Sequence, residues 1–320
     1  MYSKSLPYLS PAVQSFLFGV ASSIFVLSVL LLISDHRRHK ETDLSMLYSS
    51  SDNHKLPETS HDYRKRDSQR VRDKPRIFCW IMTSPRNEEK VNAVKATWAR
   101  RCNRYIFVSS ENNSTIPSID AGVPEGREYL WGKTKFGYEY AYNTSLEGFD
   151  WFLKADDDTF VVVENLRSLL STYSESQPYY IGCSFRPFTA QGYMSGGAGY
   201  ALNRLALRRF VENGLRTKVC RTDPGGYEDA EMGICLDKLG VNFADSRDGE
   251  GKSRFFPFSH FTHIQPNRQK NYLAYLLYPE KDLLDCCSDS AVSFHYISPY
   301  YMYFLEYFIY QLSPFGSLRL

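Results

Sequence analysis

The stretch "FLKADDDTFVV", residues 152–162, interrupts a hydrophobic run with three consecutive aspartates. Ionised aspartates only accept hydrogen bonds, and three in succession repel one another unless a cation or several donors compensate them. Alternate side chains of an extended backbone point to opposite sides, so Asp156 and Asp158 can share one site while Asp157 points elsewhere. Such oxygen ligands suit Mg²⁺ or Mn²⁺. A solvated acidic turn explains the triplet equally well by itself.

Strand-like and helix-like stretches alternate on both sides of this triplet. Residues 76–82, "RIFCWIM", predict a buried strand that ends at the polar turn "TSPRN", and a helical pattern and a second strand, "RYIFVSS", follow. Residues 132–145 predict another helix, residues 150–155 another strand, and Leu166, Leu169 and Leu170 the apolar face of a further helix. This alternation predicts an α/β fold with parallel strands, whose ligands bind beyond the carboxyl ends of the strands.

The composition indicates neither a nucleic-acid-binding surface nor a polyacidic one. The formal net charge of the 320 residues is +2, and 43% of them are hydrophobic. We therefore expect no nucleic-acid partner, and we expect charge-dependent function to be local.

The N-terminal region predicts a membrane anchor. Residues 12–33, "AVQSFLFGVASSIFVLSVLLLI", contain no charged side chain and are long enough to cross a bilayer as a helix. They predict a signal anchor after a cytoplasmic tail of residues 1–11, and a cleaved signal peptide is the alternative. The polar residues 34–73 predict a flexible stem, because they contain too little apolar surface to form a core. Residues 74–320 then form the folded domain.

Two signals disagree about the side of the membrane on which this domain lies. The basic run "HRRHK" follows the span, and the positive-inside rule would keep it in the cytosol. Seven cysteines and glycosylation patterns at Asn112, Asn113 and Asn143 favour an oxidising lumen instead. We expect a luminal domain.

Two glycine-containing stretches are candidate ligand-binding segments. "PEGREYLWGKT" places Arg127 and Lys133 in a turn and the helix after it, where they are either phosphate-binding cations or ordinary surface residues. "GYMSGGAGYALNRLALRRF", residues 192–210, contains small residues directly before a predicted helix, which has Leu202, Leu205 and Leu207 on its apolar face. These glycines indicate close approach of a ligand or a tight turn, but not a P-loop, because Gly-Lys-Ser/Thr is absent.

Two further places contain candidate acid, base or metal-binding groups. Glu228 and Asp229 precede a predicted helix, where they either cap it or provide a general base. His295 ends a strand-like stretch and is either a core residue or a third metal ligand beside Asp156 and Asp158.

Seven stretches together resemble glycosyltransferase family 31: "CWIMTSPRN", "VKATWARRCN", "DWFLKADDDTFVVVENLRSLL", "QGYMSGGAGYAL", "EDAEMG", "ADSRD" and "CCSDSAVSFHY". The resemblance runs from residue 76 to residue 318, and it is strongest to the branch of β1,3-galactosyltransferases that make core 1 O-glycans. It implies a GT-A fold, a Rossmann-like mixed sheet flanked by helices. It also implies a single-pass type II protein of the Golgi membrane with a luminal catalytic domain.

The resemblance implies a reaction as well. Galactose would pass from UDP-galactose to the 3-hydroxyl of GalNAc α-linked to Ser or Thr of glycoproteins, with inversion, Mn²⁺ as cofactor and a homodimer as the assembly. One alternative is a family member that uses another sugar or acceptor, as fringe enzymes do. The other is a non-enzymatic chaperone of the family, which lacks the acidic triplet that this chain keeps.

The resemblance assigns roles to individual residues. Asp156, Asp158 and His295 would hold the metal, with Asp156 shared with the nucleotide, and Asp229 would be the general base. The UDP site would contain Met82, Glu125, Gly126, Arg127, Lys133 and Tyr296, and the acceptor site Gly196, Gly197, Tyr272 and Tyr275. The chain departs from the family at Asn271 and Leu273, where tryptophans of the acceptor wall are expected.

The resemblance also sorts the cysteines, for which six residues alone would allow 15 pairings. It pairs Cys79 with Cys102 and Cys220 with Cys235, and it leaves the adjacent Cys286 and Cys287 as a further candidate pair. Cys183 is then the odd thiol.

Overall fold

The computed structural model describes residues 75–116, 118–265, 270–280 and 283–313. They belong to a compact unit that spans Arg66–Leu320. The predicted tail (1–11), anchor (12–33) and stem (34–73) lie outside the described residues. Among the helices that are described, none is both long enough and apolar enough to cross a bilayer.

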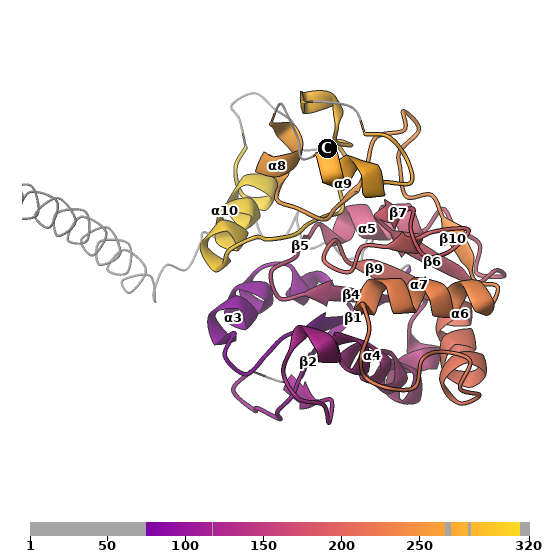
Figure 1. Ribbon diagram of the computed structural model, residues 1–320. Coiled ribbons are helices and arrows are strands. Elements are labelled where there is room, and N and C mark those ends of the chain that lie inside the picture. The colour runs from indigo at the N-terminus through magenta and orange to yellow at the C-terminus, as the bar shows by residue number, and fades with distance from the viewer. Residues whose placement is uncertain (1–74, 117, 266–269, 281–282, 314–320) are drawn as a thin grey trace, which may run out of the picture. The chain divides into compact units, whose positions relative to one another are not determined.

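A seven-stranded mixed sheet forms the centre of this unit, in the order β10-β6-β9-β4-β1-β2-β3 (Figure 1). Strand β1 runs parallel to β2 and β4, whereas β9 runs antiparallel to β4 and β6. The strands are β1 (Ile77–Met82), β2 (Arg104–Ser109), β3 (Ser118–Asp120), β4 (Trp151–Asp156), β6 (Tyr179–Gly182), β9 (Tyr200–Asn203) and β10 (Asn242–Ala244). The predicted α/β fold with a mixed sheet is confirmed.

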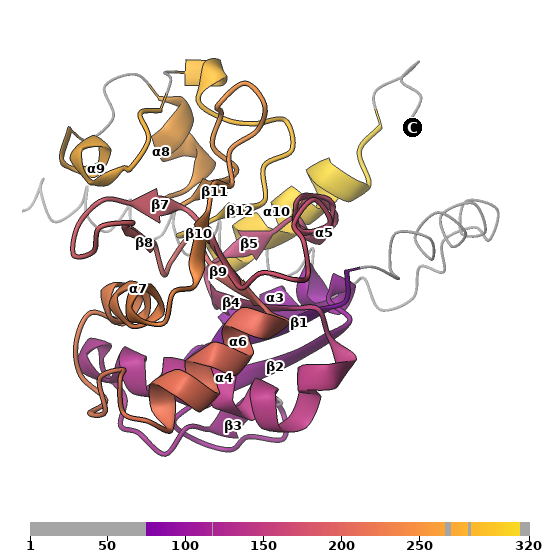
Figure 2. The same ribbon diagram turned by 90° about the vertical axis from the view of Figure 1, so that its right-hand side faces the viewer.

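Helices cover both faces of the sheet, and strand β1 shows why both faces are apolar (Figures 1 and 2). All six of its residues are buried, as expected of a central strand that is covered on both sides. Ile77, Cys79 and Ile81 join a core with α3 (Glu88–Ala96), α5 (Val163–Leu170) and α10 (Pro299–Tyr310). Phe78, Trp80 and Met82 join a second core with α4 (Leu130–Ser145), α6 (Arg204–Arg209) and α7 (Glu228–Lys238).

Two small sheets lie beside the large one. Strand β12 (Ser293–Phe294) lies between β11 (Phe255–Phe256) and β5 (Phe160–Val161), and β7 (Ser184–Phe185) pairs with β8 (Tyr193–Met194). The short helices α8 (His260–Ile264) and α9 (Lys270–Tyr275) follow β11 in the sequence.

One predicted boundary was wrong. Leu202, expected on a helix, lies in strand β9, and the helix begins only at Arg204. Residues 200–203 pair with both β4 and β6, so strand pairing overrides the helical spacing of the leucines. Asn203 ends the strand and caps the helix, because its side-chain oxygen accepts a hydrogen bond of 2.9 Å from the amide of Ala206.

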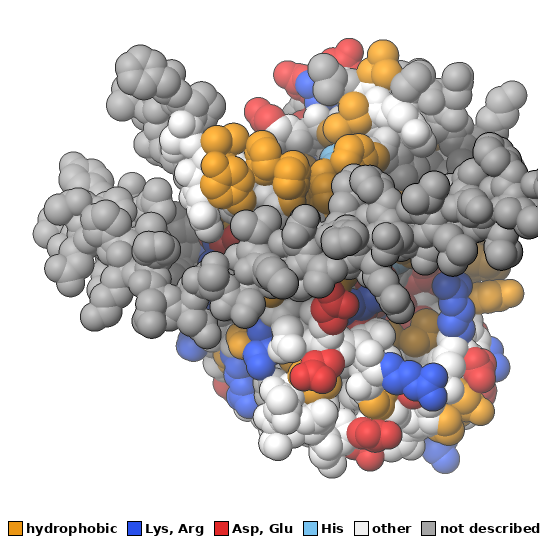
Figure 3. Space-filling model, turned by 90° about the vertical axis from the view of Figure 1, so that its left-hand side faces the viewer, with side chains coloured by type: hydrophobic (Ala, Val, Ile, Leu, Met, Phe, Trp, Pro, Cys, Tyr) orange, Lys and Arg blue, Asp and Glu red, His pale blue; other side chains and the backbone are white. Residues whose placement is uncertain are grey.

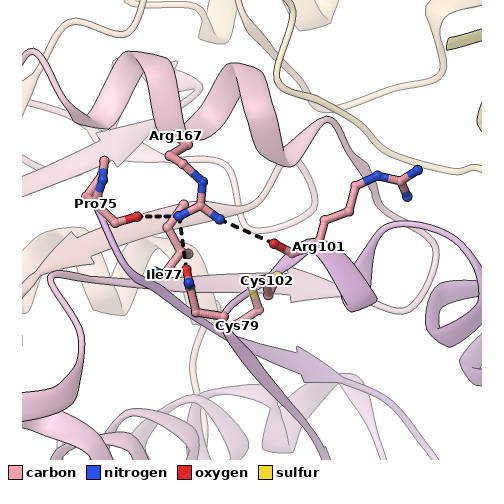
Figure 4. Close-up of a disulfide and its surroundings, with 7 residues drawn as sticks. Pro75, Ile77, Cys79, Arg101, Cys102 and Arg167 are labelled. Carbon is pink, nitrogen blue, oxygen red and sulfur yellow. Dashed lines mark hydrogen bonds between the residues drawn. A yellow bond between two sulfur atoms is a disulfide. The ribbon is translucent and has the colours of Figure 1, made fainter. Parts of the chain in front are cut away.

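The structure contains the disulfides that the family pattern implies. Cys79–Cys102 ties β1 to the segment before β2, and Cys220–Cys235 and Cys286–Cys287 are also formed. Cys183 is buried and is the free cysteine. Figure 4 shows that Arg167 lies over the first disulfide, where its guanidinium donates to the carbonyl oxygens of Pro75 and Arg101.

A buried carboxylate helps to attach helix α10 to the segment after α3. Glu306 is the only charged residue of this helix, and its carboxylate accepts hydrogen bonds from Arg100 at 2.6 Å and Arg101 at 2.7 Å. The exposed large side chains of this helix are mostly aromatic, including Tyr300, which is 60% exposed. Figure 3 shows hydrophobic side chains gathered on this face, where α8 and α10 lie.

Candidate active site

A pocket of 840 Å³ opens where β1 and β4 end at their carboxyl ends. It is lined by eleven of the residues that the sequence assigns to a site: Met82, Glu125, Arg127, Lys133, Asp156, Asp158, Gly196, Gly197, Asp229, His295 and Tyr296. Gly126 and Tyr275, which are also described, do not line it. The position agrees with the expectation that ligands bind beyond the carboxyl ends of parallel strands.

The acidic triplet divides as its alternation predicts. Asp156 and Asp158 approach His295, and one ligand atom from each of the three residues lies within 4.8 Å of the others. The Nε2 atom of His295 is 3.0 Å from Asp158 Oδ1 and 3.7 Å from Asp156 Oδ2. Asp157 points away, and its Oδ2 accepts hydrogen bonds from Thr83 at 2.6 Å and Asn87 at 2.8 Å.

This cluster fits a divalent cation by its donor chemistry. Two carboxylates and one imidazole are ligands that Mn²⁺ accepts, and three protein ligands leave positions open for phosphate oxygens. The Nδ1 atom of His295 lies 3.2 Å from the carbonyl oxygen of Pro257, a contact that orients Nε2 toward the carboxylates. Burial alone would raise the pKa of Asp158, but His295 and Lys90 outweigh it and lower this pKa to about 2. Asp158 therefore stays ionised and able to bind a cation.

The predicted nucleotide-binding residues form another wall of the pocket. Lys133 is buried on α4, and its ammonium donates to the carbonyl of Thr83 at 2.9 Å and to Glu125 Oε1 at 2.6 Å. Arg127 begins the short helix η3 (Arg127–Tyr129), after Gly126, whose φ of 145° favours glycine. Tyr296 is 55% exposed at the pocket.

The two carboxylates at the start of α7 have different environments. Glu228 is buried, and its Oε1 accepts hydrogen bonds from Thr134 at 2.8 Å and from Tyr200 at 2.5 Å. Asp229 is only partly buried, and its Oδ2 accepts one hydrogen bond of 3.1 Å from the amide of Gly196. Burial raises the pKa of Asp229, against the opposing effects of the Gly196 amide and Lys154. This geometry agrees with the family pattern, which assigns the base to Asp229, whereas the residue pattern alone left the choice between the two carboxylates open.

Lys154 is the main site residue that the sequence reasoning missed. It lies within β4, is 2% exposed, and reaches the pocket wall, where its ammonium donates to Asp156 Oδ1 at 2.6 Å. A signal was present in the sequence, because "FLKAD" places a lysine inside an otherwise hydrophobic strand. A charged residue rarely occupies such a buried position without a partner.

The predicted acceptor tyrosines lie apart from this pocket or outside the described side chains. Tyr275 is 47% exposed and packs near Phe185, with ring centroids 6.1 Å apart. Phe185 and Phe188 each lie 5.5 Å from the ring of Tyr193. Burial raises the pKa of Tyr193, and the charge of Asp229 adds to this increase. An aromatic cluster therefore joins Tyr275 to Tyr193 through Phe185, whereas the side chain of Tyr272 is not among those described.

Comparison with known proteins agrees with these motifs. The family model described as Fringe-like matches residues 73–249. The chain is 46% identical over 271 residues to glycoprotein-N-acetylgalactosamine 3-beta-galactosyltransferase 1 of Xenopus laevis, an alignment that covers 82% of this chain and 75% of that protein. It is 30% identical over 172 residues to beta-1,3-glucosyltransferase of Mus musculus, covering 52% of this chain and 34% of that protein.

Solved structures give only a distant likeness. The structure of an active-site variant of LgtC aligns with a TM-score of 0.40 and 14% identity, over 75% of this chain and 92% of that one. At that TM-score the alignment does not establish a shared fold. The family match and the Xenopus relative do establish kinship: the chain belongs to the Fringe-like family, glycosyltransferase family 31.

Proposed function

We propose that the chain is an inverting β1,3-galactosyltransferase with a GT-A fold that makes core 1 O-glycans. It would transfer galactose from UDP-galactose to the 3-hydroxyl of GalNAc α-linked to Ser or Thr of glycoproteins. The main observation in support of this proposal is that one pocket is lined both by the candidate metal ligands Asp156, Asp158 and His295 and by the candidate base Asp229. The reaction named for the 46% identical Xenopus relative supports the choice of sugar and acceptor.

The chain's residues fit Mn²⁺ as the cofactor. Asp158 and His295 would hold it directly, and Asp156 would be shared with the nucleotide. A bound divalent ion would neutralise the charge that develops on the UDP leaving group. Arg127 and Lys133 line the same pocket and would add positive charge for the diphosphate.

Asp229 would act as the general base for the acceptor. It would take the proton from the 3-hydroxyl while that oxygen forms a bond to the anomeric carbon of galactose, on the face opposite UDP. The bond between this carbon and the diphosphate oxygen breaks, and its electron pair leaves with UDP. One displacement of this kind converts an α-linked donor into a β-linked product.

We place the enzyme in the Golgi membrane as a single-pass type II protein with residues 74–320 in the lumen. Three disulfides support an oxidising compartment. The side chains of Asn112, Asn113 and Asn143 are exposed, as N-glycosylation requires. The anchor itself rests on the composition of residues 12–33.

A second candidate function is transfer of another sugar, or to another acceptor. Asn271 and Leu273 occupy positions where the family pattern has tryptophans. The Mus musculus relative is named as a beta-1,3-glucosyltransferase, which transfers a different sugar. A chaperone function is less well supported, because the complete acidic triplet and His295 form a cation-binding geometry.

The test is a transfer assay with the purified full-length chain, Mn²⁺, a panel of UDP-sugars and GalNAc-peptides. We expect a β1,3-linked galactose product from UDP-galactose alone. Transfer from a different UDP-sugar would support the second candidate. Absence of transfer from every donor, with UDP still bound, would contradict both enzymatic proposals.

A further inference from the structure

We propose that Lys154 is a positioning residue that holds the base Asp229 and the metal-site carboxylate Asp156 in a defined relative position, through the backbone of Gly196. The proposal rests on the function proposed above, since it assumes the roles of Asp156 and Asp229. It assigns Lys154 a task in the reaction beyond packing within β4.

The ammonium of Lys154 lies at the meeting point of three acceptors. It donates to Asp156 Oδ1 at 2.6 Å and to the carbonyl oxygen of Gly196 at 3.0 Å, and it lies 3.6 Å from Glu228 Oε2. The first two contacts are hydrogen bonds, and the third is an ion pair at a distance too long for a hydrogen bond. Each acceptor comes from a different part of the chain: β4, the turn before β9, and the start of α7.

Gly196 connects this ammonium to the base. Its carbonyl accepts from Lys154, while its amide donates to Asp229 Oδ2 at 3.1 Å. There is no room for a side chain at this position, because a Cβ would lie 2.5 Å from Glu228 Oε2 and 3.4 Å from Asp229 Cβ. The backbone of residue 196 is therefore held on both sides, by Lys154 and by Asp229.

Electrostatics explains why a cation is needed here. Asp156, Glu228 and Asp229 converge on one region, and Glu228 is buried. Buried carboxylates repel one another and are costly to bury without a paired cation. Without Lys154, Asp156 would lose its shortest contact and the Gly196 turn would lose a donor, so both functional carboxylates would shift. Displacements of about 1 Å in a reacting group reduce turnover by about 10²-fold.

Lys133 provides a matched comparison in the same pocket. It is also a buried lysine, but its ammonium donates to Glu125 and to the carbonyl of Thr83, and among the described residues it makes no hydrogen bond or ion pair with Gly196 or Asp229. A general effect of removing a buried lysine would therefore appear in both variants. An effect on the base would appear only after substitution of Lys154.

The experiment compares full-length Lys154→Ala, Lys133→Ala, Gly196→Ala and Asp229→Asn variants with the wild type. Transfer kinetics are measured with and without propylammonium, which can enter the space left by the lysine side chain. Calorimetry measures Mn²⁺-UDP binding independently of transfer. We expect Lys154→Ala to lower kcat by about 10²-fold and to weaken Mn²⁺-UDP binding, with partial recovery of kcat by propylammonium. Propylammonium should not restore Asp229→Asn, in which no lysine side chain has been removed.

The Gly196→Ala variant distinguishes an effect of carboxylate position from an effect of losing the lysine charge. It also keeps the proposal testable if Lys154→Ala does not fold. It keeps the lysine but displaces the backbone, so we expect lower kcat with Mn²⁺-UDP binding retained. Wild-type kcat in Gly196→Ala, or in a folded Lys154→Ala, would overturn the proposal. If the wild type transfers no sugar, the proposed function fails. In that case unchanged Mn²⁺-UDP affinity in Lys154→Ala would overturn this inference separately.

Discussion

The Nε2 atom of His295 lies 3.0 Å from Oδ1 of Asp158, although the two residues belong to distant parts of the sequence. Pairing of β12 with β5 causes this approach, because β5 follows the acidic triplet and β12 ends just before the histidine. The amide of Ile297 also donates to the carbonyl of Asp158 at 2.9 Å. Backbone pairing therefore sets the geometry of the candidate metal site.

The division of the triplet predicts opposite effects for two neighbouring substitutions. Asp158→Asn removes a charged ligand, so we expect Mn²⁺ binding and transfer to fall sharply. Asp157→Asn alters a buried carboxylate that binds Thr83 and Asn87 instead. It should reduce the free energy of unfolding by about 1 kcal/mol and leave Mn²⁺ affinity near the wild-type value. Calorimetry and denaturant unfolding measure the two effects, and equal loss of metal affinity in both variants would refute the assignment.

The second prediction concerns Gly197, which supports the metal site without contributing a ligand. A Cβ at this position would lie 2.2 Å from Cε1 of His295, so Gly197→Ala must displace the imidazole. We expect Mn²⁺ affinity to fall about tenfold or more, as for other changes to groups that orient a ligand. Gly148→Ala is the matched control, since its Cβ would meet no atom within 4 Å. Unchanged metal affinity in Gly197→Ala would argue against His295 as a ligand.

The third prediction is a pH dependence of transfer. Burial raises the pKa of Asp229 above its ordinary value of 3.8. A base must be deprotonated, so activity should be full at higher pH and should fall as the pH decreases through this raised pKa. The acid limb of kcat should therefore lie above pH 3.8, and Asp229→Asn should lose about 10²-fold or more in kcat while still binding UDP. An acid limb below the ordinary aspartate value would contradict the assignment.

The fourth prediction concerns the attachment of α10. Glu306 is 6% exposed and pairs with Arg101, whose side chain is 16% exposed. Glu306→Ala leaves this arginine only its longer ion pair with Glu164, at 3.5 Å, and we expect a loss of about 3 kcal/mol in the free energy of unfolding. Tyr300→Ser, on the exposed face of the same helix, should change stability by about 0.5 kcal/mol or less. Similar unfolding midpoints for the two variants would show that the ion pair does not hold the helix.

The sequence by itself determined the features that depend on neighbouring residues. Hydrophobic runs identified β1 and β4, and helical spacing identified α3 and α5, because burial and backbone period leave a local pattern. The period of two along a strand separated Asp157 from Asp156 and Asp158. Family motifs gave roles to eleven residues that prove to line one pocket, several of which the residue pattern had already singled out.

Only the tertiary structure decided the features that depend on contacts between distant segments. Leu202 lies in a strand because β4 and β6 pair with its backbone on both sides. Glu228 and Asp229 are adjacent carboxylates that the sequence alone does not distinguish. Contacts with Thr134, Tyr200 and Lys154 bury Glu228, whereas Asp229 stays open to the pocket. The environment of a charge is set by the atoms that surround it in space, and most of those atoms come from elsewhere in the chain.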